Sequence, residues 1–269
     1  MDKIFDILVS KFGSDLISLA EKSYLEEPRG RYKSNPMPVI KPQNTKQVSE
    51  IICFCNENNI GVIPYAGGTG LVGGQTVKSE KDMVLLSVER MQSIRNVLPD
   101  ENIIIVEAGA ILENVQQAAN DIDRLFPLAL ASQGSCRIGG NIATNAGGVQ
   151  VLRYGNTRDL CLGLEAVLPD GSILNGLKRL RKDNTGYDLR NLLIGSEGTL
   201  GIITAACLKI FPKPKETVTS LLVVSNPNAA IKVLAELQSK LDSSITAFEL
   251  IHKQSYNFLL EVCPYVKIP

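Results

Sequence analysis

The segment Pro64-Tyr65-Ala66-Gly67-Gly68-Thr69-Gly70-Leu71-Val72-Gly73-Gly74 is the starting point for interpreting the whole chain. It is dense in glycine and follows Ile60-Gly61-Val62-Ile63, a short apolar run typical of a buried strand. Glycine adopts positive φ freely and lets a backbone approach a ligand closely. Successive backbone N–H groups in such a loop form a concave anion site. The segment therefore predicts a loop that wraps a phosphate or a diphosphate.

Two other phosphate motifs fit this loop poorly. Gly68 to Gly73 matches G-x-G-x-x-G, but the dinucleotide fold with that motif needs a helix immediately afterwards. Here a short polar stretch leads directly into the strand-like run from Met83 to Leu86, so we interpret Glu89, at the offset of a ribose-binding acid, as coincidence. A P-loop is excluded because no Lys-Ser or Lys-Thr follows the glycines. The remaining alternative is a mobile turn without a ligand.

Length and composition exclude several classes of protein. The chain has 269 residues, of which 44% are hydrophobic and 21% charged, as in an ordinary soluble globular protein. Its formal net charge is zero, so we expect no nucleic-acid partner and no basic membrane-binding face. No apolar run approaches the roughly 18 residues of a membrane span, so we expect no spanning segment. The start resembles an amphipathic helix rather than a signal peptide, and we therefore expect a cytoplasmic protein.

The cysteines and the single histidine do not suggest a metal site. The six cysteines form no C-x-x-C pair, and we expect buried, reduced thiols. His252 is the one histidine, so a histidine-based metal cluster cannot form, and we interpret His252 as structural. The sequence therefore predicts no metal.

Two further segments share the glycine-rich character of the first loop. In the segment from Ser132 to Gly148, every side chain from Gly139 onward is small or polar except that of Ile142. A helical piece there would let a flat ring or a diphosphate lie directly on the backbone. The third segment runs from Ile194 to Ile203 and leads into a strand. A tightly packed turn is the alternative for the segment from Ser132 to Gly148, but the cost of so many glycines favours a ligand.

The remaining pattern predicts alternating strands and helices with a boundary near Pro212 and Pro214. We expect helices over 1–25, 44–58, 111–122 and 227–241, a hairpin over 94–98 and 103–107, and strands over 83–87, 162–168, 172–175, 220–224 and 245–251.

Together these segments resemble the FAD-binding domain of the vanillyl-alcohol oxidase and p-cresol methylhydroxylase (PCMH) type, over residues 24–250. The stretches that carry the resemblance are Pro64–Gly74, Gly139–Gly148, Arg153–Asp159 and Gly195–Ile202. They are most similar to the D-2-hydroxyacid dehydrogenases, the branch of D-lactate dehydrogenase, the glycolate oxidase FAD subunit and D-2-hydroxyglutarate dehydrogenase. The resemblance implies an α+β, PCMH-type fold of two subdomains with FAD extended between them. It divides the chain into an N-terminal helical segment (1–36), the FAD-binding domain (37–213) and the beginning of an incomplete α+β substrate or cap domain (214–269).

The resemblance also assigns cofactor residues, whereas catalytic residues stay unassigned. The first loop would hold the diphosphate through backbone N–H groups, the second segment would line the flavin, and the third would lie along the cofactor. The implied cofactor-binding residues are Pro64, Ala66, Gly67, Gly68, Thr69, Gly70, Leu71, Gly73, Gly74, Ser135, Cys136, Gly139, Gly140, Asn145, Ala146, Gly147, Gly148, Gly155, Glu197, Gly198, Gly201, Ile202 and Ile203. Some relatives attach flavin covalently to a histidine in the first loop. Thr69 stands there instead, so we expect non-covalent FAD.

The resemblance implies oxidation of a D-2-hydroxyacid by hydride transfer to flavin N5, with electrons passed to a protein or quinone rather than to NAD. The chain departs from the family because its substrate domain is short, so we expect a truncated product, a partner chain that completes the site, or lost activity. One alternative function is a flavin-binding module without its own catalysis. Another is a flavoprotein similar to alkyl-glycerone-phosphate synthase or to sugar oxidases. Arg29, Arg31 and Arg158 could meet a carboxylate, although solvated or structural roles are expected for them.

Overall fold

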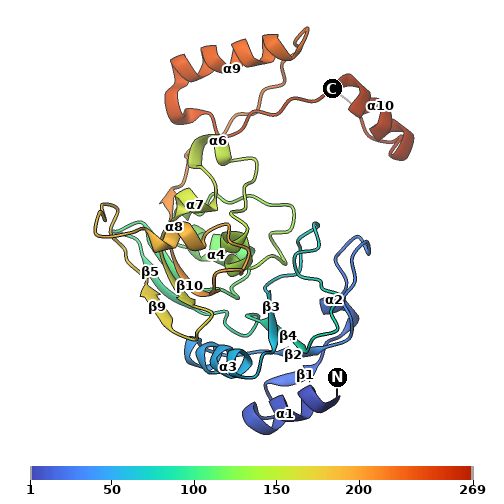
Figure 1. The fold of residues 1–269 in the computed structure, drawn as a ribbon. Helices are drawn as coiled ribbons and strands as arrows, with labels where there is room; N and C mark the ends of the chain where they lie inside the picture. The colour runs from blue at the N-terminus through green and yellow to red at the C-terminus, as the bar shows by residue number, and fades with distance from the viewer. Residues whose placement is uncertain (1, 268–269) are drawn as a thin grey trace.

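The computed structural model describes residues 2–267, and it mixes helices with two main β-sheets (Figure 1). The four-stranded sheet lies in the N-terminal part of the chain, coloured blue to teal, with strand order β1-β2-β4-β3. The five-stranded sheet lies further along the chain, with order β5-β6-β10-β8-β9. This arrangement agrees with the expected α+β fold of two subdomains.

Parallel pairing organises the first sheet. Its strands are β1 (Ile17–Leu19), β2 (Pro38–Ile40), β3 (Gly61–Tyr65) and β4 (Met83–Ser87). Strand β4 pairs in parallel with both β2 and β3, whereas β1 pairs antiparallel with β2. Helix α3 (Thr45–Glu57) connects β2 to β3, which lie on either side of β4. Parallel neighbours need a crossover connection, and residues 66–82, which contain the first glycine-rich loop, supply it between β3 and β4. The Asn44 side chain caps α3 by accepting a hydrogen bond from the backbone N–H of Gln47, as the sequence predicts.

The second sheet is antiparallel throughout. Its strands are β5 (Ile94–Leu98), β6 (Ile103–Glu107), β8 (Cys161–Val167), β9 (Ile173–Gly176) and β10 (Ile202–Lys209). The predicted hairpin of β5 and β6 is confirmed. Strand β10 is central, and every one of its residues except Lys209 is buried. It therefore fixes the third glycine-rich segment, which immediately precedes it, against the middle of the molecule.

Short helices and strands complete this body. They are α1 (Asp2–Phe12), α2 (Lys22–Leu25), α4 (Leu112–Asn120), β7 (Arg124–Leu125), α5 (Ile138–Ala143), α6 (Val151–Tyr154), α7 (Thr157–Leu160), α8 (Leu189–Leu193) and β11 (Phe211–Pro212). The expectation of a helix over 1–25 is wrong in part, because β1 interrupts it and pairs with β2. One apolar cluster runs through both sheets and includes Ile40, Ile51, Ile104, Val106 and Ala206. The two subdomains therefore share one hydrophobic core.

The C-terminal stretch has helices but almost no core. It contains α9 (Pro227–Leu241), the 3-10 turn η1 (Asp242–Ser244) and α10 (Lys253–Val262), which lie away from the body in Figure 1. The predicted helix over 227–241 is confirmed, but the strands predicted over 220–224 and 245–251 are wrong. Apolar residues there lack a neighbouring strand to pair with, and Val223 is fully exposed. No helix within residues 2–267 is both long and apolar enough to cross a membrane.

Candidate cofactor site

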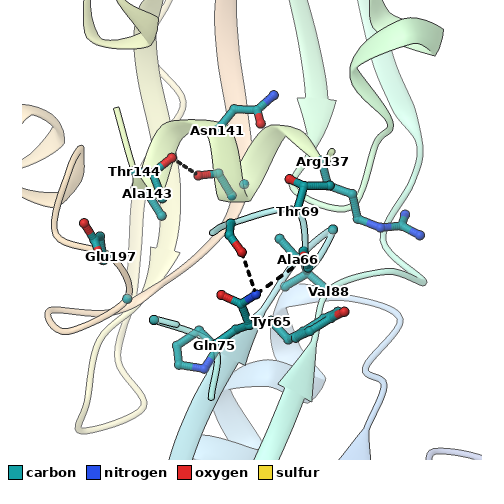
Figure 2. Close-up of a pocket in the computed structure, with 18 of the residues that line it drawn as sticks. Tyr65, Ala66, Thr69, Gln75, Val88, Arg137, Asn141, Ala143, Thr144 and Glu197 are labelled. Carbon is teal, nitrogen blue, oxygen red and sulfur yellow. Dashed lines mark hydrogen bonds between the residues drawn. The ribbon is translucent and has the colours of Figure 1, made fainter. Parts of the chain in front are cut away.

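A cavity of about 230 Å³ lies where the first glycine-rich loop faces α5 and the start of β10 (Figure 2). Loop residues such as Gly68 and Thr69 form one wall, and Gly139 and Gly140 of α5 form another. Ile202 and Ile203 of β10 belong to the same lining. Three segments that are far apart in the sequence therefore meet at one site.

The first loop presents a row of unused hydrogen-bond donors. Within the described chain, the backbone N–H groups from Gly67 to Gln75 donate no hydrogen bond. The loop is held instead through its carbonyl groups, because Nε2 of Gln75 donates to the oxygens of Gly68 and Gly70 at 3.3 and 3.0 Å (Figure 2). Gly68 and Gly73 have φ of 65° and 78°, values that glycine adopts without strain. Free N–H groups on a loop of this kind suit an anion.

The second segment approaches the first loop so closely that side chains are excluded. A Cβ on Gly67 would lie 2.6 Å from the carbonyl oxygen of Ser135. A Cβ on Gly140 would lie 2.9 Å from the Cβ atom of Ala66, and a Cβ on Gly139 would lie 2.7 Å from the Cβ atom of Ala108. Glycine at these positions therefore brings α5 against both the loop and β6, and leaves bare backbone at the cavity wall.

The third segment closes the remaining side. Glu197 has a φ of 53°, which is uncommon for a residue with a side chain, and its N–H donates to the carbonyl oxygen of Ala143 at 2.9 Å. A Cβ on Gly198 would lie 2.5 Å from the ring of Pro64. The turn before β10 is thus fastened to both of the other segments, and backbone strain at Glu197 is kept at the site.

The cavity lining carries little net charge. Among the described lining residues, Arg137 and Glu197 are the charged ones. The Arg137 guanidinium donates from Nη1 to the carbonyl oxygens of Gly109 and Glu89 at 2.5 and 3.3 Å, so it is engaged by backbone. Tyr65 also lines the cavity, where burial, followed by the proximity of Tyr24 and Glu89, raises the pKa of its hydroxyl. Tyr65 is therefore a neutral wall of the site at physiological pH.

The structure gathers most of the expected cofactor residues at this cavity. Those that line it are Pro64, Ala66, Gly67, Gly68, Thr69, Gly70, Gly74, Gly139, Gly140, Ala146, Glu197, Gly198, Gly201, Ile202 and Ile203. Lining residues that the sequence did not single out are Tyr65, Val72, Gln75, Val88, Leu130, Ser132, Arg137, Asn141, Ala143 and Thr144. Most of these residues lie within the first two glycine-rich segments, so the sequence indicated their position without naming them as cofactor residues. Gln75 directly follows the first segment, whereas Val88 and Leu130 carried no such signal.

The other expected residues are not part of the cavity lining. These are Leu71, Gly73, Ser135, Cys136, Asn145, Gly147, Gly148 and Gly155. Several of them shape the surrounding chain. Gly148 passes the carbonyl of Ala129 too closely for any side chain, and the Asn145 side chain accepts a hydrogen bond from the N–H of Arg158 at 3.0 Å. The Arg158 guanidinium is itself bound to the backbone carbonyls of Asn191 and Ile194.

The residues present fit FAD. The unused N–H groups of the first loop match the acceptor oxygens of a diphosphate. The bare glycine backbone of α5 and the apolar side chains of Ile202 and Ile203 offer a flat wall suited to an aromatic ring.

Comparison with known proteins identifies the family. A family model described as an FAD binding domain matches residues 36–176. The chain is 42% identical over 221 residues to the mitochondrial D-2-hydroxyglutarate dehydrogenase of Danio rerio, covering 82% of this chain and 41% of that protein. It is 38% identical over 261 residues to a Schizosaccharomyces pombe protein provisionally named a mitochondrial D-lactate dehydrogenase. This match covers 94% of this chain and 49% of that protein. The chain thus spans less than half the length of these relatives.

These names also overturn one expectation. The prediction of a cytoplasmic protein is wrong, because these relatives, like that of Bos taurus, are named as mitochondrial. The sequence argument failed because composition and the absence of a spanning segment do not distinguish compartments.

Among solved structures, alkyldihydroxyacetonephosphate synthase superposes with a TM-score of 0.69 at 22% identity, over 80% of this chain and 41% of that one. This likeness supports the PCMH-type fold that the sequence resemblance implies. Together with the family match over residues 36–176, it shows that the chain belongs to the FAD binding domain family and is related to the D-2-hydroxyglutarate and D-lactate dehydrogenases.

Proposed function

We propose that this chain is the FAD-binding part of an oxidoreductase that oxidises a D-2-hydroxyacid. The observation that carries the proposal is the cavity lined by the first loop, whose backbone N–H groups from Gly67 to Gln75 are unused, and by the glycine backbone of α5. The names of the relatives, which act on D-2-hydroxyglutarate and D-lactate, supply the substrate class. Those names also favour a mitochondrial location.

The residues of the chain would bind and orient the cofactor. We assign the diphosphate to the N–H groups of the first loop, the flavin side to the segment around Gly139 and Gly140, and the remaining length to Gly201 through Ile203. When bound, FAD would supply a two-electron acceptor at flavin N5 for the hydride of the substrate α-carbon, and a base would take the hydroxyl proton. Electrons would then pass to a protein or quinone acceptor. Because Thr69 stands in the first loop, we propose that FAD is held without a covalent bond.

The domain limits belong to the same proposal. We assign residues 37–213 to the FAD-binding unit and residues 214–269 to the beginning of a substrate domain. The buried core supports this division, since Ala230 is the one buried residue among 214–267.

One experiment tests the reaction directly. The purified chain, loaded with FAD, is mixed without oxygen with D-2-hydroxyglutarate, L-2-hydroxyglutarate or D-lactate, and the flavin absorbance is followed. We expect bleaching by a D-acid and none by the L-acid. Bleaching by both enantiomers at the same rate would contradict the proposal.

A second function is favoured by one specific observation. Large apolar side chains at the C-terminal end are exposed, among them Leu250, Ile251, Phe258 and Val262. Apolar residues gathered on a surface mark an interaction site, as expected for a flavin-binding module that needs a partner for catalysis. In that case the chain would still bind FAD, but no 2-hydroxyacid would bleach the bound flavin.

A further inference from the structure

A short hairpin-like loop stands next to the first glycine-rich loop. It lies between α2 and β2, and we call residues 26–33 the arginine loop after Arg29 and Arg31 near its tip. A β-bridge between Glu26 and Lys33 closes its base, and the N–H of Glu27 donates to the carbonyl of Tyr32 at 3.1 Å. In Figure 1 this blue loop and the teal loop after β3 rise on the same side of the first sheet.

A buried carboxylate holds the arginine loop in shape. Glu27 is only 2% exposed, and its two oxygens accept hydrogen bonds from the backbone N–H groups of Arg29 and Arg31 at 2.8 and 2.6 Å. The hydrogen bond from Arg29 and the others from the backbone hold the pKa of Glu27 below its usual range, so the group is ionised at neutral pH. The Glu27 carboxylate therefore binds backbone N–H groups and forms no ion pair with a guanidinium of the described chain.

The arginine loop is also joined to the glycine-rich loop. A Cβ on Gly73 would lie 2.8 Å from the ring of Tyr32, so the two loops are in contact there. Beyond this contact, the N–H of Val77 donates to Oγ of Ser34 at 3.0 Å, and the N–H of Asn35 donates to the carbonyl of Val77 at 3.1 Å. The backbone of the arginine loop is therefore fixed relative to the first glycine-rich loop, which lines the cavity.

The arginine loop holds three cations and two carboxylates, and its two guanidinium groups form no ion pair within the described chain. Arg29 and Arg31 are exposed, and neither forms an ion pair with another residue in the range 2–267. Lys33, in contrast, is paired with Glu26 at 2.9 Å. The cavity lining has one cation and one anion, Arg137 and Glu197. The arginine loop therefore adds positive charge beside the first glycine-rich loop, next to a cavity lining that is neutral overall.

We propose that Arg29 and Arg31 form a cationic rim that attracts the FAD diphosphate and speeds its entry into the cavity. Charges of one sign at the edge of a cleft raise association rates, and this effect falls with ionic strength. A rim charge alters the association rate more than the lifetime of the complex. The inference rests on FAD binding and not on hydroxyacid oxidation, so either can fail without the other.

The test measures how fast FAD binds to the deflavinated full chain, by stopped-flow quenching of flavin fluorescence at several salt concentrations. For the double variant Arg29→Gln and Arg31→Gln we expect the association rate at low salt to fall about fivefold. This is less than the roughly 10- to 1,000-fold of strong steering, because exposed Lys78 remains nearby. We expect a flatter dependence on salt and an unchanged dissociation rate.

Two controls separate charge from structure. The double variant Arg29→Lys and Arg31→Lys keeps both charges and should restore the parent rate, which a folding defect would not allow. Arg181→Gln removes an exposed arginine on the loop after β9, which lies across the molecule from α2 in Figure 1, and should leave the rate unchanged.

Three results would overturn the proposal. The first is a double glutamine variant with the parent's association rate and salt dependence. The second is a slower rate that lysine does not restore. The third is an unchanged FAD rate together with slower bleaching of bound flavin by a D-2-hydroxyacid, which would mean that the arginines serve the substrate carboxylate instead.

Discussion

At the scale of single residues, Gly67 lies where the first glycine-rich loop passes the second segment. A Cβ at this position would lie 2.6 Å from the Ser135 carbonyl oxygen and 2.9 Å from Cα of Cys136, and neither backbone atom can move aside easily. We expect Gly67→Ala to weaken FAD binding at least tenfold and to lower the free energy of unfolding by about 1–3 kcal/mol, the usual cost of overpacking. Equilibrium titration with FAD and thermal melting measure the two effects.

Gly134→Ala is the matched control for this steric argument. A Cβ there would lie 3.3 Å from Oε2 of Glu113, the end of a flexible side chain. We expect FAD affinity within twofold of the parent. Equal losses in the two alanine variants would show that contact with Ser135 does not shape the site.

Gln75 offers a second test at this scale, because its amide nitrogen holds two carbonyls of the loop. Gln75→Ala loses about 1 kcal/mol of net hydrogen bonding, which corresponds to roughly fivefold in FAD affinity. Gln75→Glu turns carboxylate oxygens toward the same carbonyls and places a negative charge beside the N–H groups for the diphosphate. Its affinity should fall by about 100-fold, and affinity equal to the parent's would argue against a diphosphate at this loop.

At the scale of elements, Glu165 on β8 fastens α3 to the second sheet. It accepts hydrogen bonds from the hydroxyls of Thr45 and Thr204 at 2.6 and 2.9 Å, and it pairs with Arg95 at 3.2 Å. Burial would raise the pKa of Glu165, but the hydrogen bonds from Thr45, Arg95 and Thr204 outweigh it and hold the pKa below its usual range. Ionised Glu165 therefore joins the helix that precedes β3 to the strand that follows the third segment.

The lowered pKa predicts a loss of stability in acid. A carboxylate whose pKa is lower in the folded state stabilises the fold above the unfolded pKa of about 4.3 and ceases to do so as the pH falls through the folded value. At neutral pH, Glu165→Gln should lower the free energy of unfolding by about 2 kcal/mol, and the gap from the parent should narrow below about pH 4. Urea unfolding of the parent and the variant at several pH values measures this difference in the free energy of unfolding.

Glu50→Gln serves as the control for the acid series. Glu50 is exposed and lies 3.9 Å from Lys46, so its removal should change stability by less than about 0.5 kcal/mol. A gap between the Glu165 variant and the parent that stays constant from pH 7 to pH 3 would contradict the role assigned to the ionised group.

The elements differ in how far the sequence predicts them. The hairpin of β5 and β6 and the capped helix α3 follow from local turn and cap residues, so both were predicted. Strand β1 is short and exists because β2 pairs with it, which the local sequence does not reveal. Residues 245–251 have an apolar pattern typical of a strand, but within the described chain they have no strand to pair with.

At the scale of the whole molecule, the body and the C-terminal stretch are unequal in packing. Ala230 is the one buried residue among 214–267, whereas the body has a core that runs through both sheets. We expect a chain ending at residue 213 to bind FAD as tightly as the parent and to melt within a few degrees of it. A shortened chain that folds but loses FAD would show that residues after 213 belong to the cofactor site.

Local sequence patterns also predict only part of the cofactor site. Glycine-rich segments predicted the walls of the cavity, because close backbone approach leaves a local mark in the sequence. Val88 and Leu130 reach the cavity through the pairing of strands and loops far apart in the chain, so no local pattern indicated them.

The most direct test of the account is the visible absorption spectrum of the purified chain, loaded with FAD, before and after acid precipitation. The account predicts flavin bands at one FAD per chain, and their complete transfer to the supernatant, because Thr69 offers no covalent attachment. A chain that takes up no FAD would contradict the proposed site. Flavin retained in the pellet would contradict non-covalent binding.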